Sequence, residues 1–364
     1  MSPPTFRDLG IPVSNATVSL KVFNVVRDMR EVYVSADFMM KPVLPGREMA
    51  TLPIFAFLIE NAAMGQRVMF DLGPRKDQEN AAPPIPEWHA TKFYAMPVDR
   101  DITEQLDDNG VDLKTISAVI WSHAHFDHTG DVSKFPASTN LVFGPETKAV
   151  SYLVDSNSDL VESDLSGRDL VRVDFDKSPL EIGGFKANDF FGDGSFYLLD
   201  VPGHLAGHLC ALARVTPTSF VLLGGDCCHH PGMLRPTSKI HRHYPCPGEI
   251  FASARRSVSA THFPPPDAVG EFDLASRTTP MLDVSDKGVY ADRDTARKSI
   301  EKIGDFDVNS DVFVALAHDE SLVDVVGPFP ALLNDWQAKD WKNKVMWAFL
   351  DEANPAFRFS AKTV

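Results

Sequence analysis

The sequence predicts a layered α/β fold in which the strands are covered on both faces. Short, continuous apolar runs of four to six residues recur along the chain, and such runs are typical of strands that are buried on both sides. Segments with helix-start and helix-stop signals lie between them. At 364 residues, of which 44% are apolar and 23% charged, the chain can bury a large core. Strands and helices mixed in this way form packed layers.

Eight segments are predicted as strands because they are rich in apolar residues and end in polar or glycine-containing sequence. These segments are 18–26, 55–59, 68–73, 118–123, 140–144, 196–204, 220–226 and 312–318. Histidine or aspartate stands at the polar end of several of them. The strand ends could therefore bring these side chains together on one rim of the domain.

Three segments are predicted as helices. Residues 101–110 start with acidic residues and end at a glycine, and residues 294–304 place Asp294 as a possible N-cap and Gly304 just past the end. A third helix is expected over residues 330–341.

Residues 229–290 differ from the rest of the chain because eight prolines stand between positions 231 and 280. Proline at this density opposes regular helices and central strands. Long loops of this kind are usually functional or disordered, and the apolar and aromatic residues in the segment favour an ordered one. We therefore expect one domain over residues 1–364, with 229–290 as an insertion that covers the site.

The composition argues against several classes of partner. A formal charge of −15 repels phosphate backbones and anionic lipid, so neither a nucleic-acid nor a membrane partner is expected. The longest apolar stretch, 52–59, is too short to span a bilayer, and residues 1–10 lack the pattern of a secretory signal. Four cysteines are too few to staple this chain, so reduced thiols and a cytoplasmic location are expected.

Residues 122–130, SHAHFDHTG, place three histidines and an aspartate directly after an apolar run. Imidazole and carboxylate groups are suitable ligands for zinc and other divalent ions. On an extended chain His123, His125 and Asp127 share a face and His128 points the other way, but a loop can bend all four inward. The alternative is a solvated polar loop with coincidental histidines. The number and spacing of the ligands favour a metal site.

This motif resembles the His-x-His-x-Asp-His signature of the metallo-β-lactamase superfamily, with every position filled. The resemblance extends over most of the chain, since VMFDLG ends near Asp71, VPGHLAGH contains His204, GGD ends in Asp226 and ALAHDE contains His318. The order of these motifs agrees with the family. The resemblance implies an αββα sandwich, here with the proline-rich insertion near the active site.

By this resemblance the protein is a hydrolase with two divalent metal ions, zinc being the default and iron or manganese the alternatives. One ion would be held by His123, His125 and His204, and the other by Asp127, His128 and His318. Asp226 and a water or hydroxide would lie between the ions. Two ions that share a water lower its pKa and generate a nucleophile. Asp127 would orient this nucleophile and pass a proton to the leaving group.

The motifs are most similar to those of the N-acyl-homoserine-lactone lactonase group. In that group a tyrosine three residues after the bridging aspartate assists the substrate carbonyl, whereas this chain has His229 there. His229 either donates a hydrogen bond in its place or packs beneath the insertion. We expect His208 to pack beside the ligands rather than to bind metal. Asp71 and Asp319 are the candidates to hold the other ring nitrogens of the ligands, although Asp71 also suits a turn before Gly73.

The substrate is expected to be a small molecule with a lipophilic or aromatic part. The insertion would roof the site, and its apolar side chains suggest a pocket for a ring: Met233, Leu234, Tyr244, Phe251 and Phe263. Phe38, Met39 and Met40 could contribute from the N-terminal side. A carbonyl within a small ring, that is a lactone or a cyclic amide or carbamate, suits such a closed pocket.

Three alternatives remain open. A thioesterase of the glyoxalase II type shares the ligand set, and cations near the mouth could receive a glutathione ester: Arg235, Lys239, Arg242, Arg255 and Arg256. A persulfide dioxygenase would use one iron and consume oxygen. A non-catalytic binding module is disfavoured because inactive relatives typically lose ligands, and this chain keeps all seven. The sequence does not indicate an oligomeric state.

Overall fold

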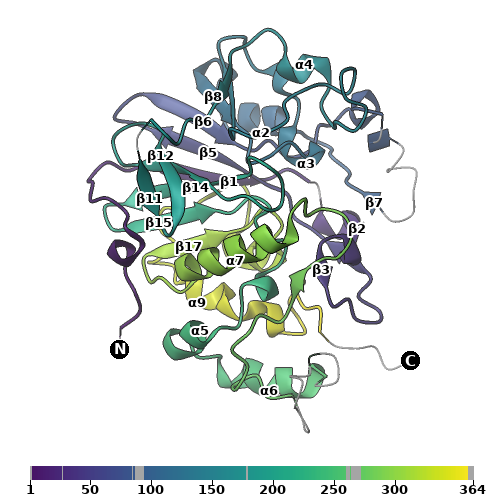
Figure 1. The fold of residues 1–364 in the computed structure, drawn as a ribbon, viewed down its shortest axis with the longest axis vertical. Helices are drawn as coiled ribbons and strands as arrows, with labels where there is room; N and C mark the ends of the chain where they lie inside the picture. Colours follow the sequence, from purple (N-terminus) through teal and green to yellow (C-terminus); the bar gives the residue numbers. More distant parts are fainter. Residues whose placement is uncertain are drawn as a thin grey trace.

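The computed structural model describes residues 2–26, 28–83, 85–86, 94–177, 179–259, 263 and 272–359. Its centre is formed by two β-sheets (Figure 1). The first sheet has seven strands in the order β10-β9-β8-β6-β5-β1-β18. Their bounds are β1 Ser19–Asn24, β5 Phe55–Asn61, β6 Gln66–Phe70, β8 Ile116–Ile120, β9 Asn140–Phe143, β10 Leu170–Arg172 and β18 Ala331–Leu332.

The second sheet has six strands in the order β11-β12-β13-β14-β15-β17. Their bounds are β11 Leu180–Ile182, β12 Phe185–Asp189, β13 Phe196–Asp200, β14 Leu209–Thr216, β15 Ser219–Leu223 and β17 Val312–Ala315. The other described strands form two small sheets. They are formed by β3 Met40–Lys41 with β16 Asp283–Val284, and by β4 Met49–Thr51, β2 Tyr33–Ser35 and β7 Tyr94–Ala95.

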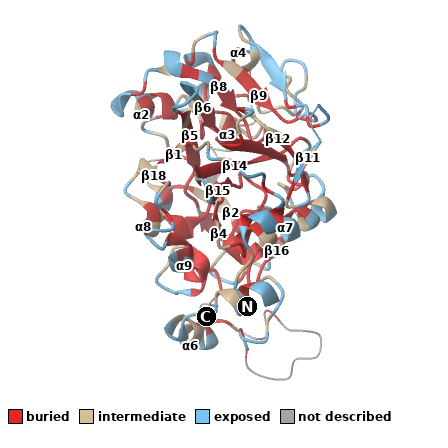
Figure 2. Ribbon diagram, turned by 90° about the vertical axis from the view of Figure 1, so that its left-hand side faces the viewer, coloured by how far each residue is buried: buried red, intermediate tan, exposed pale blue. Residues whose placement is uncertain are grey.

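The two large sheets pack face to face because their strands are apolar on both sides. In β5, Phe57 belongs to the cluster between the sheets, whereas the adjacent Leu58 packs in the cluster on the outer face. In β15, Val221 and Leu222 divide in the same way between the inner cluster and the opposite outer one. Successive side chains of a strand point to opposite faces, so each continuous apolar run serves two cores. Figure 2 shows these strands as the buried centre of the molecule.

Helices cover the outer faces of the sandwich. Ile102 and Leu106 of α2 pack on the seven-stranded sheet, and Ile303 and Phe306 of α7 pack on the six-stranded sheet. The predicted α/β layering and αββα order are confirmed. The helices whose bounds are described are α2 Ile102–Asp108, α3 Phe126–Thr129, α4 Glu162–Leu165, α5 Ser238–His243, α6 Gly248–Ser257, α7 Arg293–Asp307, α8 Val323–Val326 and α9 Trp341–Met346. In the described part of the chain, no helix has the length and apolar character needed to cross a membrane.

Two of the three predicted helices are present. α7 differs from its prediction at both ends, since it begins after Asp292 and continues past Gly304 to Asp307. The carboxylate of Asp292 accepts hydrogen bonds from the backbone N–H groups of residues 294 and 295, which makes it the N-cap. Phe306 extends the helix because its ring is buried against the sheet.

The prediction of a helix over residues 330–341 is wrong. Ala331–Leu332 form the edge strand β18, in which Leu332 pairs with Lys21 of β1, and α9 begins only at Trp341. Just beyond the strand, the side chain of Asn334 accepts from the backbone N–H of Leu20 at 2.9 Å. The free edge of β1 offers unpaired backbone groups, and this tertiary pairing overrides a modest local helix propensity.

The described part of the segment 229–290 is more regular than its prolines suggested. It contains α5 and α6, and Pro247 stands at the N-cap of α6, where a proline does not interrupt helical hydrogen bonds. In Figure 1 these helices lie at the end of the molecule opposite α4. Met233, Leu234 and Phe263 are buried in the outer core cluster of the six-stranded sheet. Their apolar surface is used for packing, so the segment does not roof the site with these residues.

The strand directions bring several loops to one rim of the sandwich. β6 and β8 are parallel, so the segments that begin at Asp71 and Trp121 leave the same edge of their sheet. β15 and β17 are also parallel, so the loops that carry Asp226 and His318 leave together. β13 leads into the loop of His204. The candidate site lies where these loops meet.

Candidate metal centre

A strand end and a short helix position the first four candidate ligands. β8 ends at Ile120, and His123 stands three residues beyond that end. His125 is the N-cap residue of α3. α3 then turns the chain so that both Asp127 and His128 are buried. The sequence predicted that a loop was needed to bend His128 inward, and α3 supplies that bend.

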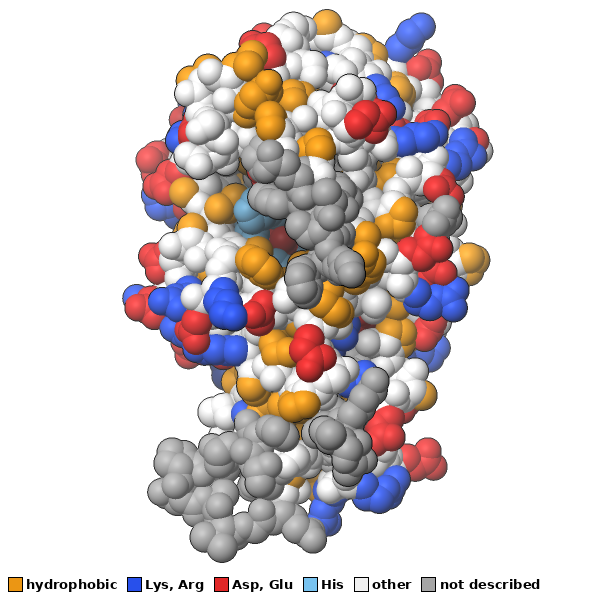
Figure 3. All heavy atoms as spheres, turned by 90° about the vertical axis from the view of Figure 1, so that its right-hand side faces the viewer, with side chains coloured by type: hydrophobic (Ala, Val, Ile, Leu, Met, Phe, Trp, Pro, Cys, Tyr) orange, Lys and Arg blue, Asp and Glu red, His pale blue; other side chains and the backbone are white. Residues whose placement is uncertain are grey.

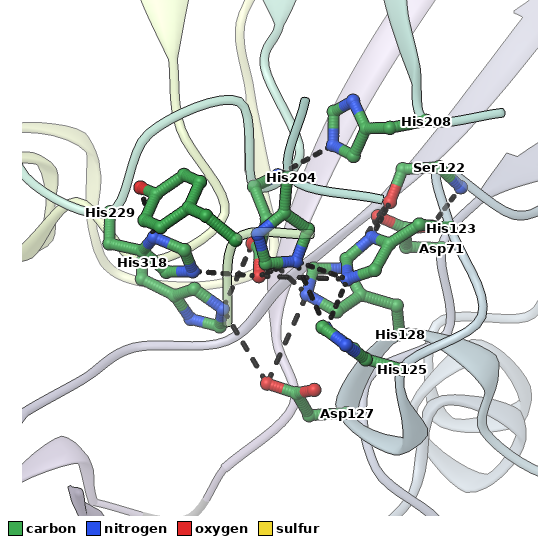
Figure 4. Close-up of polar contacts among 12 residues, drawn as sticks. Asp71, Ser122, His123, His125, Asp127, His128, His204, His208, His229 and His318 are labelled. Atoms are coloured by element: carbon green, nitrogen blue, oxygen red, sulfur yellow. Dashed lines mark hydrogen bonds and ion pairs between the residues drawn. The ribbon is translucent and has the colours of Figure 1, made fainter. Parts of the chain in front are cut away.

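One group of ligand atoms comes from His123, His125 and His204. His123 Nε2 lies 2.9 Å from His125 Nδ1 and 3.1 Å from His204 Nε2, and His204 Nε2 lies 3.0 Å from His125 Nδ1. Figure 4 shows the three rings pointing toward one another. Together with an oxygen of Asp226, these ligand atoms lie within 4.8 Å of one another.

The second group is formed by Asp127, His128 and His318, whose ligand atoms also lie within 4.8 Å of one another. Asp127 Oδ2 is 3.5 Å from His318 Nε2 and 3.9 Å from His128 Nε2. Asp226 lies between the two groups. Its Oδ1 is 3.1 Å from the Nε2 atoms of His128 and His318, and its Oδ2 faces the first group, 3.5 Å from His204 Nε2.

Hydrogen bonds on the far side of the rings fix the orientation of three ligands. His128 Nδ1 donates to Asp71 Oδ2 at 2.8 Å, and His318 Nδ1 donates to the carbonyl oxygen of Pro53 at 3.0 Å. His123 Nδ1 lies 3.0 Å from Ser122 Oγ. Such partners fix the tautomer, so that the lone pair of Nε2 points into the site.

Of the two aspartates proposed for this task, Asp71 performs it and Asp319 does not. Asp71 also accepts hydrogen bonds from the backbone N–H and hydroxyl of Ser122 at 2.7 and 2.8 Å, so it ties the end of β6 to the histidine loop. Asp319 instead caps the short 3-10 helix that follows it, by accepting from the N–H of Ser321 at 2.9 Å.

Burial keeps the first group of histidines neutral. Burial lowers the pKa of His125 to about 4 and lowers the pKa of His123 and His204 well below the usual value. Burial alone would raise the pKa of Asp226 and lower the pKa of His128 and of His318, but the attraction between the carboxylate and the two protonated rings lowers the first well below its usual range and raises the other two. A neutral imidazole and an ionised carboxylate are the forms that bind a metal ion.

Two buried atoms at the centre lack the hydrogen bonds that buried polar atoms normally have. His128 Nε2 and Asp226 Oδ1 have no hydrogen-bond partner among the described residues, although they lie 3.1 Å apart. An unsatisfied buried polar atom is costly. The lone pairs of these two atoms would be satisfied by cations bound between the ligand groups. The residues present therefore fit a pair of divalent metal ions.

His208 belongs to neither ligand group. Its Nδ1 lies 3.1 Å from the carbonyl oxygen of Val201, and its Nε2 accepts from the backbone N–H of Asp226 at 3.1 Å. Both ring nitrogens are thus used by the backbone. This geometry agrees with the expectation that His208 packs beside the ligands, and it shows that the ring supports the loop of Asp226.

His229 faces the same centre from the side. Its Nε2 lies 3.1 Å from Asp226 Oδ2, and its Nδ1 lies 2.7 Å from the hydroxyl oxygen of Tyr290. Sequence reasoning missed Tyr290 and the carbonyl of Pro53 because no motif marks either. It also missed Ser122, for which its place directly before His123 was the available signal.

A cavity of about 810 Å³ opens above the ligands, and His125, Asp127, Asp226, His229 and His318 line its floor. Figure 3 shows histidine side chains at the bottom of a hollow bordered by hydrophobic side chains. The described residues that make its apolar wall are Val34, Phe38, Met39, Leu52, Met96, Phe126 and Val289.

The wall differs from the predicted one. Phe38 and Met39 line the cavity as expected, whereas Met40 is not among its described lining residues. The apolar side chains expected from the insertion are absent from the described lining, since Met233, Leu234 and Phe263 are core residues and Tyr244 and Phe251 pack against that core. Within 229–290, the lining comes from His229 and residues 287–289.

Comparison with known proteins also points to a metal-dependent hydrolase fold. The family model described as the metallo-beta-lactamase superfamily matches residues 50–298. The protein named metallo-hydrolase mfmC, from Annulohypoxylon moriforme, is 39% identical over 96% of this chain and 90% of its own length. The protein named gamma-lactamase FDB1, from Fusarium pseudograminearum (strain CS3096), is 35% identical over 95% of this chain and 84% of its own length.

Other relatives are longer, and this chain spans 39% of the length of one curated protein that it matches at 37% identity. Among solved structures, a quorum-quenching N-acyl homoserine lactone hydrolase aligns with a TM-score of 0.54 over 88% of this chain and 99% of its own. The two sequences are 16% identical, so this likeness concerns the fold.

Proposed function

The chain belongs to the metallo-beta-lactamase superfamily, and from that premise we propose that it opens a lactone or a cyclic amide or carbamate by metal-dependent hydrolysis. The observation that carries the proposal is the pairing of two ligand groups through Asp226 at the floor of a largely apolar cavity. The relatives named gamma-lactamase and the lactone hydrolase fold support the same reaction class.

We assign the ligands of the first ion to His123, His125 and His204, those of the second to Asp127, His128 and His318, and Asp226 to both. This assignment follows the two groups of ligand atoms and the position of each Asp226 oxygen. Zinc is the metal we expect, because imidazole and carboxylate sets of this kind suit it. Bound there, two divalent ions would lower the pKa of a shared water and polarise the substrate carbonyl.

Two side chains are assigned to the reaction itself. Asp127 lines the cavity and faces the second ligand group, so its carboxylate can orient the attacking water and carry a proton to the leaving group. His229 lines the cavity beside Asp226, and its Nε2–H can donate to the carbonyl oxygen of the substrate. The ring-opened leaving group stays attached to the carbonyl, so one cavity can hold both reacting groups.

The cavity wall favours a neutral substrate with a lipophilic or aromatic part. Among its described lining residues, Lys287 is the one lysine or arginine, and its Nζ is 2.6 Å from Asp37 Oδ2. Asp159 adds a carboxyl group whose pKa burial raises to about 7. An anionic substrate would therefore find no available lysine or arginine among the described residues of this wall.

The glyoxalase II alternative is disfavoured for the same reason. Arg235 is buried and donates from Nε to Asp307 Oδ2 at 2.7 Å, and Lys239 pairs with Asp305 at the surface. The other three predicted cations are Arg242, Arg255 and Arg256. None of the five is among the described residues that line the cavity. The carboxylates of a glutathione ester would thus meet none of these five cations along the described part of the wall. A persulfide dioxygenase is disfavoured because the ligands form two groups rather than one.

The proposal is tested with zinc-loaded protein and a panel of aryl-fused and alkyl-substituted lactones, lactams, cyclic carbamates and glutathione thioesters. We expect at least one cyclic substrate to be opened with a kcat/KM about tenfold or more above that of any thioester. Turnover confined to thioesters, or oxygen consumption by protein with a single iron per chain, contradicts the proposal.

A pair of variants tests the wall. Phe38 lines the cavity with 46% of its surface exposed, whereas Leu153 is 69% exposed and is not a lining residue. Phe38→Ala removes apolar contact area, so KM for an alkyl- or aryl-substituted ring should rise about tenfold. Leu153→Ala should leave KM unchanged. Equal effects of the two substitutions would remove the assigned role of the wall.

A further inference from the structure

Tyr290 makes a buried contact that the ligand assignment does not use. The residue lies between β16 and α7, its side chain is buried, and its hydroxyl oxygen is 2.7 Å from His229 Nδ1. Within the described chain, the other polar neighbour recorded for this hydroxyl is Met233 Sδ at 3.9 Å. A thioether is a weak acceptor, so His229 is the main partner.

The backbone holds Tyr290 in register with the loop of His204. The N–H of Ala291 donates to the carbonyl oxygen of His204 at 2.8 Å, and the N–H of Asp292 donates to that of Gly203 at 3.0 Å. The tyrosine ring stands edge-on to two imidazoles, with centroid distances of 5.2 Å to His229 and 5.4 Å to His204. Its hydroxyl is therefore placed by a rigid frame.

The partners of His229 decide which ring nitrogen carries its proton. Asp226 Oδ2 is a carboxylate oxygen that accepts, and it lies 3.1 Å from His229 Nε2, so Nε2 is the donor. In the neutral form, which has one N–H, a proton on Nε2 makes Nδ1 an acceptor, and the hydroxyl of Tyr290 donates to it.

We propose that Tyr290 is a positioning residue that keeps the proton of His229 on Nε2, the nitrogen directed at the reaction centre. This inference rests on the proposed function for its consequence, because the Nε2–H is the group assigned to the substrate carbonyl. Without the hydroxyl, the proton can move to Nδ1, and Nε2 can no longer donate. Tyr290 thus acts through His229 and does not itself touch the substrate.

The test is Tyr290→Phe, which keeps the ring and removes only the hydroxyl. The side-chain ¹⁵N shifts of His229 are read by NMR in the zinc-loaded protein, with His229→Gln used to assign the signal. The parent should show Nε2–H alone, and the variant should show a mixture of both tautomers. With an identified substrate, kcat should fall about tenfold while KM and metal content change little.

A double variant separates positioning from packing. In the His229→Gln background, Tyr290→Phe should cause no further loss of kcat, since the residue it positions is absent. Tyr197→Phe, which removes another buried tyrosine hydroxyl in β13 at the strand end away from the His204 loop, should leave the His229 shifts and kcat unchanged.

The inference is overturned if Tyr290→Phe leaves His229 entirely as the Nε2–H tautomer, if the parent shows both nitrogens protonated, or if the two substitutions reduce kcat additively. The NMR measurement needs no substrate. If no ring is opened by any member of the panel, the proposed function fails while the tautomer shifts still decide the role of Tyr290.

Discussion

At the scale of single residues, the carboxylate of Asp226 connects the two halves of the candidate centre. Its two oxygens face different groups of histidines, and its backbone N–H is held by the buried ring of His208. Asp71 does similar work at the other side, where it joins Ser122 to His128. The ligand geometry therefore depends on buried hydrogen bonds between strand ends as well as on the ligands themselves.

Asp127→Ala tests the residue assigned to orient water. We expect a folded protein whose kcat is lower by about 100-fold or more, the scale of a positioned acid–base group. The variant should have a circular dichroism spectrum like that of the parent, and it should retain less metal. Turnover at the parent rate would show that Asp127 has been given the wrong role.

The burial of His230 predicts that the folded protein loses stability as the pH falls. Its Nε2 donates to the carbonyl oxygen of Ala356 at 2.7 Å, its Nδ1 accepts from the N–H of Gly232 at 2.9 Å, and burial lowers its pKa to about 3. Because the unfolded chain takes up this proton near pH 6.5, the stabilisation is present above that pH and is lost as pH falls toward 3.

The measurement is the free energy of unfolding in urea at about pH 7 and about pH 5.5, for the parent and for His230→Gln. The parent should lose about 1 kcal/mol more than the variant over this step. Protonation of the other histidines affects both proteins and cancels in the comparison. A parent and variant with the same pH dependence would mean that His230 is not held neutral.

At the scale of elements, short loops after buried strands carry the chemistry. The loop between β13 and β14 contains Gly207, whose φ is +73° and where a Cβ atom would lie 2.4 Å from the backbone nitrogen of Thr147. Glycine is required there by both its conformation and the close approach. The same loop carries His204 and His208, so its path determines where one ligand and one support lie.

Gly207→Ala is matched by Gly192→Ala, because Gly192 has a similar φ of +76° and no atom within 4 Å of an added Cβ. Both variants bear the cost of a left-handed residue, about 1 to 2 kcal/mol. Gly207→Ala alone must also displace neighbouring backbone, so it should lose about 2 kcal/mol more in urea unfolding and should bind metal less well. Equal losses in the two variants would remove crowding as the cause.

At the scale of the whole molecule, the metal should couple the two sheets. The ligands come from loops of both sheets, since His123 follows β8 and His318 follows β17. An ion that binds only the folded chain stabilises it by mass action, about 3 kcal/mol at a free concentration of 100 times Kd. Chelation should therefore abolish turnover and lower Tm by several degrees.

The control is His204→Ala, which lacks one ligand. Its Tm should respond less to chelator than that of the parent, and re-addition of zinc should restore both Tm and turnover in the parent alone. A parent whose turnover survives dialysis against a strong chelator would remove the metal from the reaction.

The sequence predicted the candidate ligands and the strands β1, β5, β6, β8, β9, β13, β15 and β17, but it missed five strands of the two large sheets, among them β14 between β13 and β15. Continuous apolar runs such as 55–59 and 220–223 predict strands buried on both faces because the pattern is local. The spacing of His123, His125, Asp127 and His128 also lies within one loop, so the chemistry of the motif can be read from neighbouring positions.

Tertiary structure alone decided which segment forms the edge strand of the first sheet, which groups hydrogen-bond to the site histidines, and which side chains line the cavity. Within the predicted helix 330–341, Ala331–Leu332 pair as β18 because β1 offers an open edge, and no local signal reports that edge. Tyr290 meets His229, and Pro53 meets His318, only when segments far apart in sequence pack together. The apolar residues of 229–290 fill the core while Phe38 lines the cavity, because burial depends on which surfaces the finished fold brings into contact.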